Sequence, residues 1–179
     1  KTIPGAIDDK DFYKLSFIEK IELRRKFNIP DNSFICGFVF RNQLRKEVGP
    51  LIEGYALWKK QNPEIKNTYL LFHTNFSEPQ GWDIPRYCDD IGLDKKYILV
   101  CYICKTCRDY EIKSWIGQDL DCKYCGTKKN QITINVADGI TEEELNQVYN
   151  LMDCYYHAAN ASGLELPICE ALMSELPVG

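Results

Sequence analysis

The chain has 179 residues, a hydrophobic fraction of 45% and a formal net charge of -4. This apolar content argues against disorder, and the slightly acidic balance excludes the global basic field that attracts nucleic acid. No run approaches 18 apolar residues and no signal-peptide pattern opens the chain, so we expect neither a membrane span nor export. The location predicted from these features is cytoplasmic.

Helix and strand signals alternate along the first hundred residues. Ser16 and Glu19 form a capping-box pattern, which predicts the start of a helix. Short apolar runs predict buried strands between the helices. In order, we expect a helix from Ser16 to Phe27, a strand at 33–40, a helix from Pro50 to Pro63, a strand at 68–72, a short helix ending near Ile91, and a strand at 96–100.

A cluster of cysteines then interrupts this alternation. Nine cysteines occur in the chain, and five of them lie between Cys101 and Cys125. Two Cys-x2-Cys pairs, 14 residues apart, supply the four thiolates that a closed tetrahedral zinc site needs. Gly126 follows the second pair, where a left-handed turn residue is useful. We predict a structural zinc ion in an inserted ribbon at 101–129, held by Cys104, Cys107, Cys122 and Cys125, with Cys101 as a spare thiol.

Strand and helix signals resume after the cysteines. Thr141 and Glu144 form a second capping box. We expect a strand at 132–136, a helix from Thr141 to Asp153, a strand at 154–157, and a helix with Pro167 in its first turn that Pro177 closes. This order is typical of an α/β protein with a parallel sheet. The N-terminus of the last helix would face the carboxyl end of a strand, an arrangement that favours anion binding.

The stretch from Asp153 to Val178 resembles the donor-binding signature of GT-B glycosyltransferases of family four. The matching residues are, in order, Asp153, His157, Gly163, Leu166-Pro167, Glu170-Ala171 and Leu176-Pro177-Val178. The opening Ile3–Asp8 and the turn Gly81–Pro85 are also similar to segments of these enzymes. The chain departs from the signature at Ser162, where the family has the first glutamate of a Glu-x7-Glu pair.

The resemblance implies a Rossmann-like parallel sheet flanked by helices, the C-terminal lobe of the GT-B fold, formed by 1–100 and 130–179 around the inserted zinc-ribbon hairpin. It implies that Arg41 and Lys46 hold the donor diphosphate and that Glu170 accepts hydrogen bonds from the ribose. These three residues are the candidate catalytic residues. The other candidate donor-binding positions are Gly37, His157, Ser162, Gly163, Leu164, Glu165 and Leu166.

Each of these polar residues also has a plainer interpretation. From the residues alone, Arg41 and Lys46 fit a solvated loop after a strand. Glu170 fits a helix-dipole partner in a first turn. His73, at the end of the predicted strand 68–72, fits a ligand contact or a hydrogen-bonded structural histidine. We interpret Trp82 as a packing residue.

The activity implied by the resemblance is transfer of a sugar, with retention of configuration, from a nucleotide-diphosphate donor. The family's acceptor lobe precedes this one, so we expect the chain to be inactive alone and to self-associate at its C-terminal edge. The alternative is a non-enzymatic module whose ribbon docks protein or nucleic acid. Nucleic acid is not expected, because the ribbon is not markedly basic: Lys105, Arg108, Lys113 and Lys123 face Asp109, Glu111, Asp119 and Asp121.

Overall fold

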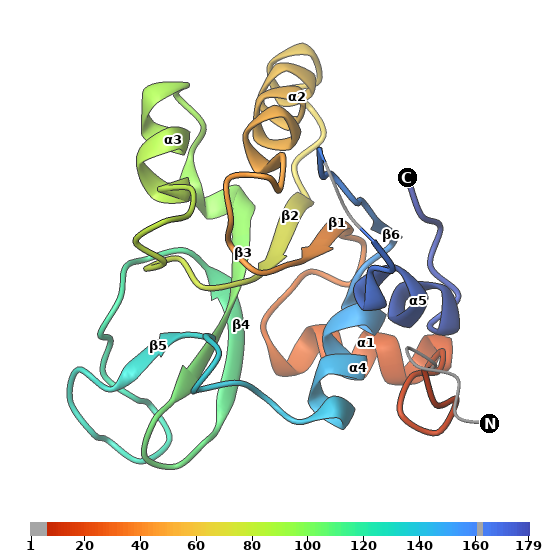
Figure 1. Cartoon of the computed structure of the whole chain (residues 1–179), viewed down its shortest axis with the longest axis vertical. Coiled ribbons are helices and arrows are strands. Elements are labelled where there is room, and N and C mark those ends of the chain that lie inside the picture. The colour runs from red at the N-terminus through yellow and green to blue at the C-terminus, as the bar shows by residue number, and fades with distance from the viewer. Residues whose placement is uncertain (1–6, 161–162) are drawn as a thin grey trace.

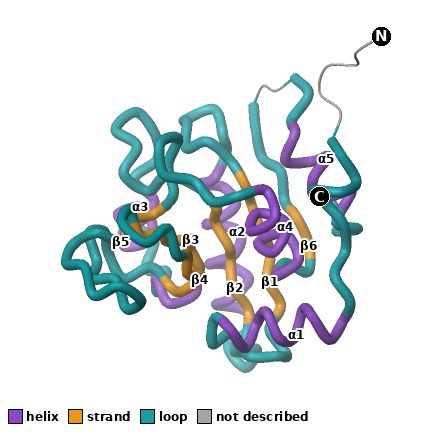
Figure 2. The backbone as a smooth tube through the Cα atoms, turned by 90° about the horizontal axis from the view of Figure 1, so that it is seen from below, coloured by secondary structure: helices purple, strands orange, loops and turns teal. Residues whose placement is uncertain are grey.

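The computed structural model describes residues 7–160 and 163–179 and shows a three-layered α/β protein. The middle layer is a six-stranded sheet whose main path runs β4-β3-β2-β1-β6, with β5 paired to β3. Helices α2 and α3 pack on one face of the sheet, and α1, α4 and α5 pack on the other (Figures 1 and 2). This architecture confirms the expected Rossmann-like α/β class.

Parallel strands form the centre of the sheet: β1 (Phe34–Val39), β2 (Thr68–His73) and β3 (Ile98–Cys104). All residues of β3 are buried, because helices cover both faces of the parallel region. On the other side of β1, the short strand β6 (Cys154–Tyr155) also runs parallel. The carboxyl ends of β1 and β6 therefore open at the same edge of the sheet.

Strand β3 continues past the parallel region into the cysteine segment. There β4 (Tyr110–Ser114) and β5 (Gln131–Thr133) both pair with it in the antiparallel sense. The strand expected at 96–100 begins later, at Ile98, because Lys95–Tyr97 form the 3-10 turn η1. It also runs longer than expected, to Cys104. The strand expected at 132–136 does not resume the parallel sheet. It is a short antiparallel strand, and Val136 beyond it is 88% exposed.

Side-chain caps fix where two helices begin. In α1 (Phe17–Lys26), Ser16 accepts the N–H of Glu19, whose carboxylate reaches back to the N–H of Ser16. Thr141 and Glu144 make the same reciprocal pair at the start of α4 (Glu142–Leu151). Both expected capping boxes are confirmed. The remaining helices are α2 (Val48–Gln61), α3 (Ile84–Asp90) and α5 (Leu166–Met173).

Helix α5 ends at Met173, four residues earlier than expected. Glu175 adopts a left-handed conformation (φ 55°), the N–H of Glu175 donates to the Leu172 carbonyl (3.0 Å), and the N–H of Leu176 donates to the Ala171 carbonyl (3.0 Å). These paired bonds form a Schellman termination. The helix therefore ends through its own backbone geometry, before Pro177.

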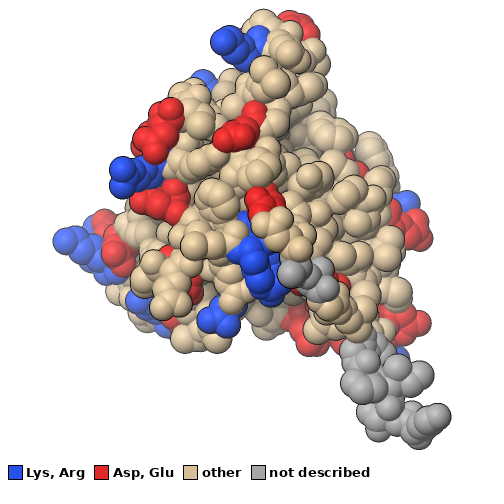
Figure 3. Space-filling view, turned by 45° about the horizontal axis from the view of Figure 1, so that its top comes forward, with Lys and Arg blue, Asp and Glu red and all other residues tan. Residues whose placement is uncertain are grey.

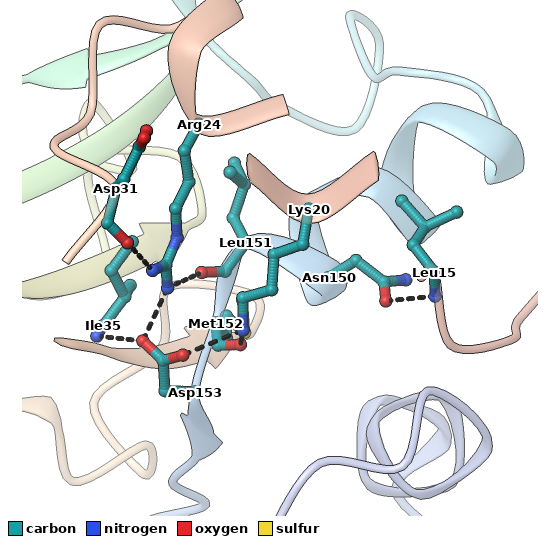
Figure 4. Close-up of polar contacts among 9 residues, drawn as sticks. All are labelled: Leu15, Lys20, Arg24, Asp31, Ile35, Asn150, Leu151, Met152 and Asp153. Atoms are coloured by element: carbon teal, nitrogen blue, oxygen red, sulfur yellow. Dashed lines mark hydrogen bonds and ion pairs between the residues drawn. The ribbon is translucent and has the colours of Figure 1, made fainter. Parts of the chain in front are cut away.

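Asp153 does not end α4, which stops at Leu151, but anchors three elements. One carboxylate oxygen accepts the N–H of Ile35 in β1 (2.8 Å) and pairs with Arg24 of α1 (2.7 Å). The other oxygen pairs with Lys20 of α1 (2.8 Å). Figure 4 shows these contacts converging on one carboxylate. Asp153 therefore fastens α1 to the amino ends of β1 and β6.

The last residues extend the sheet beside β6. The N–H of Tyr155 donates to the Pro177 carbonyl (2.8 Å), and the N–H of Gly179 donates to the Tyr155 carbonyl (3.0 Å). A parallel bridge between Tyr155 and Val178 accompanies these bonds. Within the described ranges, no helix combines the length and apolarity that crossing a membrane requires.

Candidate functional site

Two loops meet beyond the carboxyl ends of β1 and β6. The β1–α2 loop (residues 40–47) and the β6–α5 loop (residues 156–165) leave adjacent parallel strands, so they lie at the same edge of the sheet. The N–H of Glu47 donates to the Ala158 carbonyl (3.1 Å), and the N–H of Asn160 donates to the Arg45 carbonyl (3.0 Å). These backbone bonds join the two loops, although the segments are far apart in sequence.

An ion pair also joins the two loops. Lys46 Nζ lies 2.6 Å from Glu165 Oε1, and Arg45 Nη1 lies 3.5 Å from the same oxygen. The Lys46 side chain is only 3% exposed, and that of Glu165 is 15% exposed. Burial raises the pKa of Glu165, but the hydrogen bond and charge of Lys46 outweigh it and hold that pKa below its usual value. Lys46 is therefore a buried cation at the edge where ligands of open α/β sheets bind.

His157 lies against aromatic side chains near this ion pair. Its ring centroid is 5.7 Å from that of Phe38 and 6.4 Å from that of Tyr155. Within the described ranges, neither ring nitrogen has a hydrogen-bond partner. Burial, reinforced by the positive charge of Lys46, lowers the pKa of His157, so the ring is neutral at pH 7. A neutral imidazole can donate one hydrogen bond and accept another.

Glu170 lies in α5 and faces α4. Its Oε2 accepts a hydrogen bond from the hydroxyl of Tyr149 (2.7 Å), a side chain that is fully buried. Burial raises the pKa of Glu170, while the Tyr149 hydroxyl opposes that rise. The first turn of α5 contains no acidic residue, so the interpretation of Glu170 as a helix-dipole partner in a first turn is wrong. The tyrosine holds one oxygen in place, which orients the carboxylate.

Arg41 lies apart from the ion pair. It is exposed and lines an open cavity of about 300 Å³ together with Asn42, Gln43, Leu44, Arg45, Glu78 and Gln80. Figure 3 shows basic side chains gathered near the centre of the face that includes this edge. Arg41 and Lys46 thus share one loop, but only Lys46 is built into the contact between the two loops.

Asn42 organises the β1–α2 loop, and sequence reasoning missed it. Its amide nitrogen donates to the carbonyls of Asn75 (3.0 Å) and Trp82 (2.9 Å), and its oxygen accepts the N–H of Trp82 (2.9 Å). Gly81 packs so closely that an added Cβ would overlap the Asn42 amide. A polar residue between two basic ones carries no sequence signal for this role, because its partners come from a different loop.

Trp82 is a packing residue, as expected. Its ring meets that of Tyr87 edge-on at 5.6 Å, and it approaches Gly49 so closely that an added Cβ there would collide with the indole. His73 is also internal: it is buried at the end of β2, and within the described residues its Nδ1 has no hydrogen-bond partner. Burial lowers the pKa of His73 to about 4.

The other candidate positions lie in β1 and around the β6–α5 loop. Gly37 lies inside β1, where an added Cβ would overlap the side chain of Met152, so its role is close packing of α4 on the sheet. Leu164 is 68% exposed and Leu166 is 42% exposed. Gly163 lies in the same exposed turn. Ser162 falls outside the described residues.

The four knuckle cysteines form one cluster. Their sulfur atoms all lie within 4.8 Å of one another, and the Cys104–Cys125 and Cys107–Cys122 sulfur pairs are each 3.7 Å apart. Four sulfurs in a tetrahedron with metal–sulfur bonds of about 2.3 Å are separated by about 3.8 Å. The cluster therefore has the dimensions of a tetrahedral tetrathiolate site.

The two knuckles share one backbone geometry. After the first, Arg108 has φ 65° and its N–H donates to the Cys104 carbonyl (3.0 Å); after the second, Gly126 has φ 74° and its N–H donates to the Cys122 carbonyl (2.9 Å). The expected left-handed turn at Gly126 is confirmed. The hydroxyl of Thr127 lies 3.1 Å from Cys125 Sγ, and its hydrogen bond lowers the pKa of this thiol to about 6. A lowered thiol pKa favours the thiolate that binds metal.

No protein-family model and no curated protein matches the chain. Among solved structures, the C-terminal domain of a glycosyl transferase group 1 family protein (LpcC) from Francisella tularensis superposes with a TM-score of 0.61 and 19% identity. The alignment covers 97% of this chain and 69% of that one. The chain has the fold of a glycosyltransferase C-terminal domain.

A second similar structure is sucrose-phosphate synthase from Thermosynechococcus elongatus, with a TM-score of 0.61 and 19% identity. Here the alignment covers 99% of this chain but only 34% of the longer enzyme. At these identities the likeness concerns the fold. It confirms the fold that the resemblance to GT-B C-terminal lobes implied.

Ion pairs neutralise much of the charge in the cysteine segment of this glycosyltransferase-like fold. Lys113 and Lys123 both pair with Glu111, and Lys128 pairs with Asp121. Outside these pairs, Arg108 reaches Asp138 (2.8 Å). Four of the basic side chains of this segment therefore have an acidic partner.

Proposed function

We propose that this chain is the nucleotide-sugar-binding lobe of a glycosyltransferase that uses a nucleotide-diphosphate donor with retention of configuration. The observation that carries the proposal is the buried Lys46 at the sheet edge where the β1–α2 and β6–α5 loops meet. A buried cation needs an anion beside it, and Glu165 supplies that charge in the free chain. A donor diphosphate would bring its own negative charge to the same cation, close to the start of α5.

The surrounding residues fit complementary roles in holding such a donor. Arg41, exposed on the same loop, has the planar fork that binds phosphate oxygens in pairs. Glu170, oriented by Tyr149, supplies a carboxylate oxygen to accept ribose hydroxyl hydrogens. His157 has two ring nitrogens without partners in the described ranges, and these suit sugar hydroxyls. Fixed positive groups of this kind stabilise a leaving diphosphate.

We further propose that turnover needs an acceptor-binding lobe besides this one. The lobe is expected to bind donor by itself and to transfer no sugar. Self-association beside β6 is part of the same proposal, because Pro177–Gly179 lie at the outer edge of the sheet and unpaired edges associate. Sedimentation at several protein concentrations measures it, and a concentration-independent monomer would contradict it.

We propose that the four-cysteine cluster holds one structural zinc ion. All four ligand positions are supplied by protein thiolates, so no position is open for water or substrate. The ion would join the start of β4 to the turn before β5 and fix the two antiparallel strands against β3. Its contribution is to folding rather than to sugar transfer.

Thermal denaturation in the presence of nucleotides tests the donor proposal. Uridine, guanosine and adenosine diphosphates and their glucose conjugates are each added, with a mixed-sequence oligonucleotide as the rival ligand. Ligand at ten times its Kd should stabilise the protein by about 1.4 kcal/mol. Lys46→Met should abolish the shift, whereas Lys14→Met, which removes an exposed and remote cation, should preserve it. A shift with the oligonucleotide and none with the nucleotides would overturn the proposal.

A further inference from the structure

The position that suits a bound phosphate already contains a carboxylate of this chain. Glu165 Oε1 lies 2.6 Å from Lys46 Nζ and 3.5 Å from a guanidinium nitrogen of Arg45. The three groups come from two loops, so the carboxylate reaches across the site rather than along its own segment. Two cations around one oxygen is also the arrangement that would hold a phosphate oxygen.

The carboxylate of Glu165 has no helix-capping role. Glu165 is the N-cap residue of α5, but its side chain makes no cap hydrogen bond to the first turn of that helix. The carboxylate instead forms an ion pair with Lys46. The contrast with the surface pair Arg25–Asp31 is clear, because those side chains are 67% and 42% exposed, whereas Lys46 and Glu165 are 3% and 15% exposed.

A diphosphate and the Glu165 carboxylate cannot both occupy this position. An anion bound to Lys46 would bring phosphate oxygens into contact with the carboxylate, and two negative charges at such a distance repel strongly in a partly buried site. Glu165 lies at the exposed start of a helix, next to Leu164 and Leu166, which are 68% and 42% exposed. Release of Lys46 would require the Glu165 side chain to rotate toward solvent.

We propose that Glu165 is an internal anion that competes with the donor diphosphate for Lys46 and so sets the donor affinity of this lobe. The proposal rests on the proposed donor function. In the free lobe, Glu165 neutralises the buried lysine. When a diphosphate binds, Glu165 leaves Lys46 and the phosphate replaces it.

Calorimetric titration with inorganic pyrophosphate tests the competition without involving a base or a sugar. Glu165→Gln keeps the shape of the side chain and removes its charge, and Glu165→Gly removes the side chain. Both variants should bind pyrophosphate about tenfold or more tightly than the wild type, because charge-assisted contacts to Lys46 no longer have to be broken. Equal or weaker binding by folded variants, or no binding by any form of the protein, would overturn the proposal.

Two controls locate the effect at Lys46. Glu175→Gln removes the same charge from an exposed, remote pair with Lys14 and should leave the Kd unchanged. Lys46→Met combined with Glu165→Gln should lose the gain. If Glu165→Gln does not fold, Glu165→Gly gives the same comparison, because the glycine variant leaves α5 with a residue that is accepted at an N-cap.

Nucleoside diphosphates added to the same panel separate the two proposals. If they bind more tightly than pyrophosphate, and bind more tightly still to the Glu165→Gln variant, both proposals are supported. If Glu165→Gln tightens pyrophosphate binding but nucleoside diphosphates bind no more tightly than pyrophosphate, the internal anion is supported and the nucleotide-donor function is overturned. If nucleosides bind well and Glu165→Gln changes nothing, the donor function is supported and the internal anion is overturned.

Discussion

The guanidinium of Arg24 lies 2.7 Å from the carboxylate of Asp153, at the edge of the sheet opposite the proposed donor site. The same guanidinium donates to the carbonyls of Asp31 (2.9 Å) and Leu151 (3.2 Å). Arg24 is 4% exposed. One buried cation therefore joins α1, the turn before β1, and the chain that leaves α4 (Figure 4).

Asp153→Asn should destabilise the protein by about 3–5 kcal/mol, because it leaves the buried charge of Arg24 without its anion. The substitution preserves side-chain shape, so the loss reports charge rather than volume. Denaturant unfolding measures it. The control is Glu175→Gln in the exposed Lys14–Glu175 pair, for which a loss of about 0–1 kcal/mol is expected. Similar losses for both variants would contradict the anchoring role of Asp153.

Freshly purified protein should contain one zinc ion per chain, and Cys122→Ser should reduce that content to near zero. Cys122 is 2% exposed and belongs to the tetrathiolate cluster, so its loss removes one of four ligands. Elemental analysis provides the measurement. Cys169→Ser, in α5 and outside the cluster, should retain the metal. Chelation should also lower the melting temperature, and an unchanged melting curve in metal-free protein would refute a structural role.

Two glycines should respond oppositely to alanine. Gly37→Ala should cost about 1–3 kcal/mol, since the added methyl would overlap Met152 in a packed core. Gly54→Ala, in the exposed interior of α2 with open space around it, should stabilise by about 0.5–1 kcal/mol. Denaturant midpoints compare the two variants. A tolerated Gly37→Ala would mean that α4 lies farther from β1 than described.

His73 should make the fold sensitive to acid. Burial lowers its pKa to about 4, below the value of about 6.5 for an exposed histidine. Between these pH values the unfolded chain binds a proton that the folded protein excludes, so stability falls as pH drops from about 6.5 to about 4. His73 contributes no pH dependence above that window.

His73→Gln isolates this contribution, which amounts to roughly 2–3 kcal/mol lost by pH 4.5 in the wild type. The free energy of unfolding is measured at pH 7 and at pH 4.5 for both proteins. The difference between the two pH values should be smaller in the variant by that amount. Parallel pH profiles would show that His73 is protonated equally in both states.

Local sequence patterns were sufficient where the deciding interactions are local. In the capping boxes at Ser16 and Thr141, the hydrogen bonds join residues three positions apart. Both helices begin where these pairs predict. The cysteine knuckles likewise carry their turn geometry within each Cys-x2-Cys pair, which is why the four clustered cysteines and the left-handed Gly126 could be named in advance. Apolar runs also predicted the central strands, because a strand that is buried on both faces is apolar along its whole length.

Long-range partners were decided only by the tertiary structure. Nothing local to Asp153 indicates that it binds Arg24 and Ile35, and nothing local to Asn42 indicates that it holds the turn at Trp82. The pairing of Lys46 with Glu165, 119 positions apart, arises because β1 and β6 are adjacent and parallel and so deliver their loops to one edge. The sequence by itself determined the α/β class, the cysteine cluster and the starts of α1 and α4, since these depend on neighbours along the chain. The adjacency of strands decided which charged side chains form ion pairs. An ion pair depends on distance in space, and only the folded sheet sets that distance.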